Sequence, residues 1–273
     1  MTAVSREALP KPPGRGNAKV SAAVDAVLFP VAALVIWELV SQAMGPAIAR
    51  TLPPPSRVLA EGWVALASGD LFRNIVHSLW RVVGGFSIAA AVGIPLGIGI
   101  AISSWFEDIA DPIVEFLRPI PPIAWIPLGI LWFGIGNVQN MFIIFLGAVF
   151  PIVLNTIAGA RGVDRNLVWA ALTLGGRPSQ IVREIILPGA LPLVLTGLRI
   201  GLSVGWMSLV AAELVAARAG LGFMIQNARY SMVTERVILG MVVIGMLGLL
   251  MDRGMRLVEQ RLTPSRVSLS DRS

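Results

Sequence analysis

One polar-flanked segment interrupts an otherwise apolar chain: DRNLVWAALTLGGRPSQIVREIILPGALP, residues 164–192. Asp164 is suited to cap the start of a helix, because its carboxylate accepts a hydrogen bond from a free backbone N–H. Gly175 and Gly176 are expected to end that helix, since glycine readily adopts the left-handed conformation. Pro178 then reopens a helix at its first position, where its missing N–H costs nothing. The segment therefore predicts two short helices joined by a glycine elbow, lying outside the lipid.

Each of the two predicted helices has an apolar face at helical spacing. The first face consists of Leu167, Ala170, Ala171 and Leu174, and the second of Ile181, Ile185 and Ile186. Pro188 and Pro192 are expected to stop the second helix before the next apolar run. A plain connector between two membrane spans would also produce such a pair of helices.

The composition is that of a membrane protein. Of 273 residues, 55 % are hydrophobic and 14 % charged, and the mean hydropathy is +0.77. These values predict a single polytopic membrane domain. The formal charge of +6 reflects arginines at the ends of spans and not nucleic-acid binding, because basic and aromatic residues do not alternate as they do in single-strand binders. The absence of cysteine excludes disulfides and thiolate metal sites, and no metal site is predicted.

Six apolar runs of roughly twenty residues are long enough to cross ~30 Å of hydrocarbon. They cover residues 24–44, 79–103, 113–135, 139–160, 191–216 and 236–256. The predicted fold is therefore all-α, with about six transmembrane helices. The predicted organisation is a flexible tail over 1–22, a first span and its connection over 23–78, a permease-like bundle over 79–258 that contains the loop 161–192, and a second tail over 259–273.

Basic residues predict the orientation. Six spans place both termini and the 161–192 loop on one side, which carries most of the arginines and both lysines. The opposite side holds only Arg50, Arg57, Arg73, Arg218, Arg229 and Arg236. The positive-inside rule therefore predicts that both termini and the loop are cytoplasmic.

Polar residues inside the spans are functional candidates. Arg81 and Arg199 would attract an anion, but both lie near span ends, where an arginine also reaches the interface and pairs locally. We favour the second interpretation for Arg81 and leave both open for Arg199. Arg199, Ser203 and Ser208 are the candidate substrate pathway, and Glu213 is expected to be an interfacial or structural carboxylate.

Small residues recur every four positions in two spans: Gly93 and Gly97 in one, and Gly197, Gly201 and Gly205 in another. Such stripes let helix backbones approach closely in lipid. They predict tight packing between spans.

The 164–192 segment resembles the cytoplasmic loop of ABC importer permeases. That loop has the pattern Glu-Ala-Ala, three residues, Gly, about nine residues, an apolar pair and Pro. The matching residues are Ala170, Ala171, Gly175, Ile186, Leu187 and Pro188, and Trp169 stands where the family usually has Glu.

The resemblance extends from Leu52 to Leu262 and is strongest to permeases of nitrate-, aliphatic sulfonate- and taurine-type importers. It is carried by LPPPSRV (52–58), SLWRVVGGF (78–86), GIPLGIGIA (93–101), RPIPPIAWIPLGILWFGIG (118–136), FPIVLNTIAG (150–159), LVAAELVAARAGLGFMI (209–225) and IGMLGLLMDR (244–253). Where the family usually continues with Gly-Glu and later Lys, this chain has Gly136-Asn137 and Asn140.

The resemblance implies the transmembrane subunit of a type I ABC importer in the inner membrane, with no catalytic residue of its own. Its partners would be an ATPase subunit that holds ATP and magnesium, a second permease copy in a homodimer, and an extracytoplasmic binding protein. The residues that would dock the ATPase are Leu167, Trp169, Ala170, Ala171, Leu174, Gly175 and Pro188. The implied solute is a small oxyanion such as an aliphatic sulfonate, taurine or nitrate, although bicarbonate and pyrimidine-type vitamin precursors use similar permeases.

Sequence features independent of the resemblance agree with it. A phosphate-binding loop needs GxxxxGK[ST], and the only lysines, Lys11 and Lys19, follow Pro and Ala. ATP hydrolysis is therefore expected from another chain. A secondary transporter is the alternative, but it would carry ionisable groups near mid-membrane. A membrane enzyme would need a convergent set of acid, base or nucleophile, which this composition disfavours.

Overall fold

The structure is a computed structural model that describes residues 15–43, 45 and 51–262, with side chains from residue 28 onward. Every element in this part of the chain is helical. The chain divides into two compact units, residues 1–60 and 61–273, which are treated separately below. The predicted tails over 1–22 and 259–273 fall largely outside the described residues, since the first helix begins at Arg15 and the last ends at Leu262.

The first unit contains α1 (Arg15–Ala43) and the start of α3 (Pro55–Ala67). The predicted span 24–44 lies in α1, where Leu28–Ala43 is an apolar helix. Near the end of α1, the Glu38 carboxylate accepts hydrogen bonds from Ser56 N at 3.0 Å and Ser56 Oγ at 2.8 Å. Glu38 therefore accepts from one of the backbone N–H groups at the start of α3, which have no partner within that helix.

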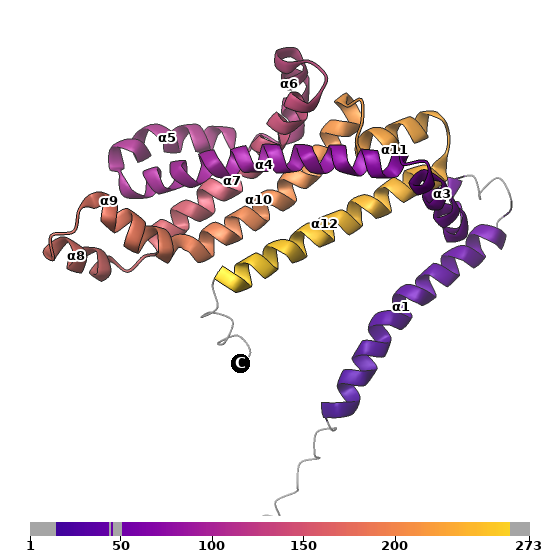
Figure 1. The fold of residues 1–273 in the computed structure, drawn as a ribbon, viewed down its shortest axis with the longest axis horizontal. Coiled ribbons are helices and arrows are strands. Elements are labelled where there is room, and N and C mark those ends of the chain that lie inside the picture. The colour runs from indigo at the N-terminus through magenta and orange to yellow at the C-terminus, as the bar shows by residue number, and fades with distance from the viewer. Residues whose placement is uncertain (1–14, 44, 46–50, 263–273) are drawn as a thin grey trace, which may run out of the picture. The chain divides into compact units, whose positions relative to one another are not determined.

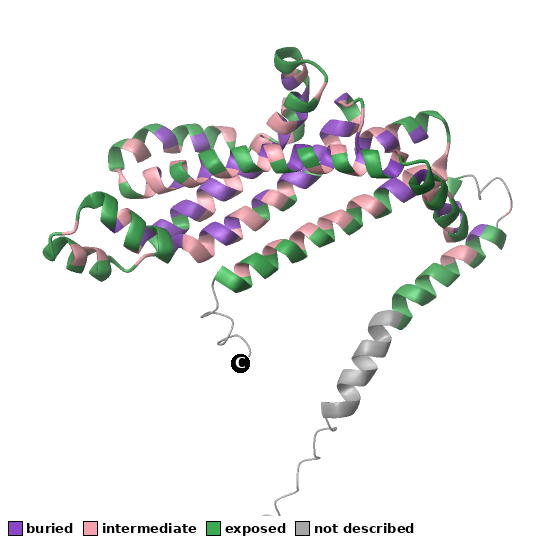
Figure 2. Cartoon of the chain, viewed as in Figure 1, coloured by how far each residue is buried: buried purple, intermediate pink, exposed green. Residues whose placement is uncertain are grey.

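Four helices of the second unit are long and apolar enough to cross a membrane (Figure 1): α4 (Asp70–Ile102), α7 (Asn137–Arg161), α10 (Leu187–Ala216, joined to the helix that precedes it) and α12 (Thr234–Leu262). These helices confirm four of the predicted spans. Helix α7 packs against both α4 and α10, and it carries the most buried residues, drawn in purple in Figure 2. The core of the unit therefore runs along α7.

Glycines let these three helices approach closely. A Cβ atom on Gly93 of α4 would lie 3.0 Å from Ile152 Cγ2 of α7, and one on Gly201 of α10 would lie 2.9 Å from the Ala148 carbonyl oxygen. Ile152, which is fully buried, thus fills the space that both glycines leave open. The predicted role of the glycine stripes is confirmed.

The prediction of one continuous span over 113–135 is wrong. The chain forms α5 (Ser104–Leu117), a turn, a 3-10 helix (Pro122–Trp125) and α6 (Ile126–Phe133), and the two halves are bent by 89°. Pro119, Pro121 and Pro122 explain the break, because proline has no N–H to donate and forces the preceding residue out of the helical region. Counting this pair as one broken span, the second unit has up to five spans among its described residues.

The prediction that Pro188 and Pro192 stop a helix is also wrong. Helix α9 (Pro178–Ile181) continues through a π-helical turn (Val182–Ile186) into α10. In this turn the Leu187 N–H donates to the Val182 carbonyl, five residues back, so the turn is wider than in an α-helix. The wider turn accommodates Pro188, which would otherwise clash with the carbonyl four residues earlier.

Candidate functional site

The loop at one end of the second unit has the predicted helix–elbow–helix form. Helix α8 (Arg165–Thr173) begins where Asp164 Oδ1 accepts a hydrogen bond from Asn166 N at 2.9 Å. Gly175 has φ +81°, in the left-handed region, and Pro178 is the first residue of α9. The cap, the elbow and the restart are confirmed.

Helix α8 is attached to the unit by only a few side chains. Val168 and Ala171 pack against a buried cluster that includes Ile181 and Ile186. No residue of α8 is fully buried. The large apolar side chains of α8, and that of Leu174 directly after it, are about half exposed or more: Leu167 is 56 %, Trp169 67 %, Leu172 48 % and Leu174 88 % exposed.

The predicted docking residues therefore divide into two groups. Ala171 is half-buried and faces the unit, so the predicted apolar face of the first helix is split. The others lie on the open surface of the loop: Leu167, Trp169, Ala170, Leu174, Gly175 and Pro188.

A hollow of about 650 Å³ separates α8 from the ends of the neighbouring spans. Ile102 at the end of α4 and Ile186 line it on one side, and Trp169 and Leu172 of α8 on the other. At its edge, Arg161 Nη2 lies 2.7 Å from Glu107 Oε1, with both side chains about half exposed. The loop thus projects from the span ends instead of being packed onto them.

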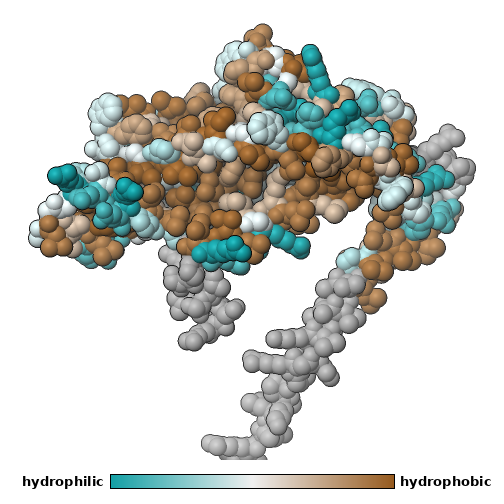
Figure 3. Space-filling view, viewed as in Figure 1, coloured by the Kyte–Doolittle hydropathy of each residue, from teal (hydrophilic) through white to brown (hydrophobic). Residues whose placement is uncertain are grey.

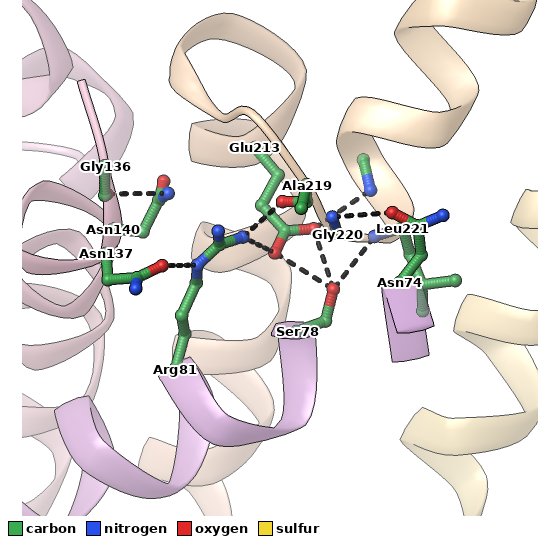
Figure 4. A network of polar contacts seen from close by, with 11 residues as sticks. Asn74, Ser78, Arg81, Gly136, Asn137, Asn140, Glu213, Ala219, Gly220 and Leu221 are labelled. Carbon is green, nitrogen blue, oxygen red and sulfur yellow. Dashed lines mark hydrogen bonds and ion pairs between the residues drawn. The ribbon is translucent and has the colours of Figure 1, made fainter. Parts of the chain in front are cut away.

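A buried ion pair lies toward the opposite end of the unit (Figure 4). Arg81 Nη1 of α4 lies 2.6 Å from Glu213 Oε1 of α10, and the two side chains are 3 % and 0 % exposed. The Ser78 hydroxyl lies 2.9 Å from both carboxylate oxygens of Glu213, and Gly222 N donates to Oε2 at 2.9 Å. The carboxylate has a partner on each oxygen, as a buried charge requires.

The same network connects further elements (Figure 4). Arg81 donates through Nε to Asn137 Oδ1 at the start of α7, at 2.9 Å, and through Nη1 to the Ala219 carbonyl, at 2.6 Å. Gly220 N donates to Asn74 Oδ1 at 2.9 Å. Since Gly220 directly precedes α11 (Leu221–Tyr230), the network joins α4, α7, α10 and α11.

These contacts correct the expectation for Arg81. Its guanidinium does not extend to an interface and has no local partner, because it pairs with a residue 132 positions away inside the protein. Its charge is compensated by Glu213, so it offers no free charge to an anion. Glu213 was expected to be an interfacial or a structural carboxylate, and its buried pairing with Arg81 makes it a structural one.

Sequence reasoning missed this network as a unit, although a signal was present. Asn74, Ser78 and Arg81 recur at intervals of four and three residues, which places them on one face of α4. A polar stripe in an apolar span requires a polar partner, and Glu213 is the carboxylate in the α10 span that supplies it.

Of the candidate pathway residues, Arg199 and Ser203 lie together on α10, where the Ser203 hydroxyl donates to the Arg199 carbonyl at 3.1 Å, and Ser208 lies apart from them. Arg199 Nε lies 2.7 Å from Asp252 Oδ1 of α12, and Nη1 lies 3.8 Å from Glu259 Oε2, so its charge is compensated. Ser203 is on the same side of α10 and lines a small hollow with Asp252. Ser208 lies on the far side, where it is close to Gly147 of α7.

Among the residues that the structure describes, no group of three histidine or acidic side chains could hold a metal ion.

Comparisons with known proteins identify the architecture. Residues 93–264 match the family described as binding-protein-dependent transport system inner membrane component. The taurine transport system permease protein TauC of Escherichia coli is 42 % identical over 218 residues, covering 78 % of this chain and 79 % of that protein. The putative aliphatic sulfonates transport permease protein SsuC of Bacillus subtilis is 36 % identical over 256 residues, covering 94 % and 91 %.

The fold is also found among solved structures. A chain of the MetNI methionine ABC transporter, in an inward-facing conformation, superposes with a TM-score of 0.57 at 22 % identity, covering 69 % of this chain and 95 % of that one. At this identity the likeness concerns the fold alone. The family match and the sequence relatives together show that this chain belongs to the inner membrane components of binding-protein-dependent ABC transport systems.

Proposed function

We propose that this permease imports a small sulfonate, using ATP that is hydrolysed on a separate subunit. The relatives named for taurine and for aliphatic sulfonates support the sulfonate. Nitrate, bicarbonate and pyrimidine-type vitamin precursors are the competing solutes. The chain itself needs no catalytic residue or bound cofactor for this role, because ATP and magnesium would be held by the ATPase subunit.

The observation that carries the proposal is the exposed apolar surface of the 161–192 loop. Leu167 and Trp169 of α8, and Leu174 directly after it, are each more than half exposed, and no residue of α8 is fully buried. Exposed apolar clusters of this kind mark protein–protein contacts. We assign the surface to ATPase docking, with Leu167, Trp169, Ala170, Leu174, Gly175 and Pro188 in contact and Ala171 anchoring the helix from behind.

The assembly that we propose contains two copies of this chain, two ATPase subunits and one extracytoplasmic binding protein. The loop and both termini would be cytoplasmic, as the distribution of basic residues predicts. The buried ion-pair network would then lie toward the outer side, where the binding protein delivers the solute. Figure 3 agrees with this arrangement, since hydrophilic side chains gather toward the two ends of the bundle and apolar ones between them.

In the proposed mechanism, ATP binding brings the two ATPase subunits together and displaces α8 as a rigid body. One continuous helix runs from Pro178 to Ala216. Because α9 and the α10 span belong to this helix, it would transmit the motion to the span. The hollow behind α8 leaves room for such a displacement. The bundle would then change from an inward-facing to an outward-facing state while the loaded binding protein is docked.

The proposal is tested by purifying the chain from its native membrane in mild detergent and assaying for a co-purifying ATPase. A parallel sample carries Gly175→Trp, which places a bulky side chain at a residue with φ +81° on the docking surface. The control is Gly254→Trp in α12, where an added Cβ would meet nothing within 4 Å. We expect ATPase activity with the native chain and the control, and its loss with Gly175→Trp.

Absence of ATPase activity from the native sample would overturn the assignment. If Gly175→Trp retained both ATPase assembly and uptake, docking through this loop would be wrong. The solute is then identified by adding the binding protein, loaded either with taurine or with nitrate, to the reconstituted complex. The stimulation of ATP hydrolysis is compared between the two solutes. Stimulation by nitrate alone would contradict the sulfonate.

A further inference from the structure

The first turn of α7 holds two buried amide side chains whose hydrogen-bonding groups are incompletely used. Gln139 and Asn140 are both fully buried. Within the described part of the chain, Nε2 and Oε1 of Gln139 and Oδ1 of Asn140 have no hydrogen-bond partner. The Asn140 Nδ2 group is satisfied, because it donates to the Gly136 carbonyl at 3.0 Å (Figure 4). One donor group and two acceptors are therefore buried without a partner.

The neighbours of Gln139 are apolar. Its Cγ atom lies 3.3 Å from the point where a Cβ atom on Gly129 of α6 would lie, and Phe142 and Ile143 contact the same point. An amide buried without a hydrogen bond is unfavourable, and most buried polar atoms in proteins have a partner. Stability therefore does not explain a glutamine here, since a methionine of nearly the same volume would suit these neighbours better.

Helix α6 covers Gln139 and is attached to the bundle by few residues. It projects from the bundle (Figure 1), and of its eight residues only Ile126 and Gly129 are buried. An 89° bend precedes α6, and Gly134, with φ +71°, follows it. Both joints are non-helical, and segments of this kind absorb the dihedral changes of a hinge motion. Displacement of α6 would therefore uncover the Gln139 amide.

The two amides lie near the buried ion-pair network. Asn137, in the same turn of α7, accepts a hydrogen bond from Arg81 Nε at 2.9 Å. This is the end of the unit at which we propose that the binding protein delivers the solute. The charge of Arg81 is compensated by Glu213, and the amides themselves are uncharged, so a solute at this site would not meet a net negative charge.

We propose that Gln139 and Asn140 contact the transported solute and that α6 is the lid that closes over them. The oxygens of a sulfonate would accept hydrogen bonds from Gln139 Nε2, and an amino group on the same solute would donate to Gln139 Oε1 and Asn140 Oδ1. The three unpartnered atoms thus match the donors and acceptors of an amino sulfonate. The inference rests on the proposed function, because it assigns the residues that contact the solute of that function.

The test removes the unpartnered atoms of Gln139 by Gln139→Met, which nearly preserves the volume of the side chain. The variant is purified with its ATPase and reconstituted into liposomes with the taurine-loaded binding protein. Three quantities are measured: the unfolding temperature, the stimulated rate of ATP hydrolysis, and the taurine imported per ATP hydrolysed. The control is Gln226→Met in α11, because Gln226 Nε2 donates to Tyr230 Oη within the same helix, at 2.8 Å.

We expect Gln139→Met to unfold at the temperature of the native chain or above it, because no satisfied hydrogen bond is lost. Stimulated ATP hydrolysis should persist, since Gln139 lies away from the docking loop. Taurine imported per ATP should fall about tenfold or more, which is the effect of losing one or two hydrogen bonds to a charged group. Gln226→Met should leave all three quantities unchanged.

Unchanged import per ATP in Gln139→Met would overturn the inference. A joint fall of the unfolding temperature and of stimulated ATP hydrolysis would also overturn it, since this result would make Gln139 a structural residue. Failure of the proposed function is distinct from both results. In that case the native complex itself lacks ATPase activity or does not respond to the taurine-loaded binding protein.

If Gln139→Met does not assemble, Gln139→Cys decides the matter, because the chain has no other cysteine. We expect an impermeant thiol reagent to modify it on the order of 10-fold faster with ATP and loaded binding protein than without them, because a buried site reacts only when its cover opens. Equal rates in the two conditions would show that α6 does not act as a lid.

Discussion

At the scale of single residues, the Arg81–Glu213 pair is the interaction on which the most other contacts depend. Removing two charges from water is costly, and their attraction compensates for this only when further hydrogen bonds complete the site. Ser78, Asn137, Gly222 and the Ala219 carbonyl complete it here. Loss of either charge would leave the other buried and unpaired.

We therefore predict that Glu213→Ala lowers the free energy of unfolding by about 3–5 kcal/mol, as is typical when one partner of a buried pair is removed. The exposed pair Arg73–Asp70 supplies the control, since Arg73 is 68 % exposed and Arg73→Ala should cost no more than about 1 kcal/mol. Thermal unfolding of the purified protein in detergent measures both variants. In a double-mutant cycle, Arg81→Leu with Glu213→Leu should cost less than the sum of the single changes. Additive costs would show that the pair is not coupled.

At the scale of elements, the bundle depends on how closely α4 and α10 approach α7. Ile152 lies between Gly93 and Gly201, so the volume at this contact is set by three side-chain positions. Interiors packed in this way have no room for added atoms, and overpacking typically costs about 1–3 kcal/mol. The cost is larger where the obstacle is backbone, which cannot rotate away.

Gly201→Leu should therefore destabilise the protein by at least about 1–3 kcal/mol, because its Cβ would lie 2.9 Å from the Ala148 carbonyl oxygen. Gly254→Leu, in the open on α12, is the matched change and should leave the unfolding temperature nearly unchanged. Both are measured by thermal unfolding in the same detergent. A similar unfolding temperature for the two variants would mean that the contact between α10 and α7 tolerates extra volume.

Much of this element structure was predictable from sequence because its causes are local. Asp164, Gly175 and Pro178 act on backbone within a few residues, and apolar length alone identifies α4, α7, α10 and α12. Two failures share a different cause. The hydropathy of residues 113–135 indicates one apolar run, but the prolines within 118–122 break the helix there. Pro188 was predicted to end a helix, but a π-helical turn accommodates it. The partner of Arg81 was not predictable from local pattern, since 132 residues separate it from Glu213.

At the scale of the whole second unit, its two ends differ in structure. Helices α8 and α9 lie at one end and α11 at the other (Figure 1). The first end has an exposed apolar helix with a hollow behind it, whereas the second is held together by the buried ion-pair network. An end that moves and an end that stays fixed would let a push on α8 change the tilt of the spans between them. This division requires the two ends to face opposite sides of the membrane.

We predict that a cysteine at Leu174 reacts with an impermeant thiol reagent only from the cytoplasmic side, and a cysteine at Met232 only from the outer side. The two positions are matched, because the native side chains are 88 % and 87 % exposed and the chain has no other cysteine. Right-side-out and inside-out membrane vesicles from cells that make this chain without its ATPase subunit would be labelled in parallel, so that no docked ATPase covers Leu174. The reason for the orientation is that basic residues accumulate on the loop and both tails, and positively charged loops remain in the cytoplasm. Labelling of both positions from one side would show that the unit does not cross the membrane as proposed, and the reversed pattern would place the docking loop on the side without ATP.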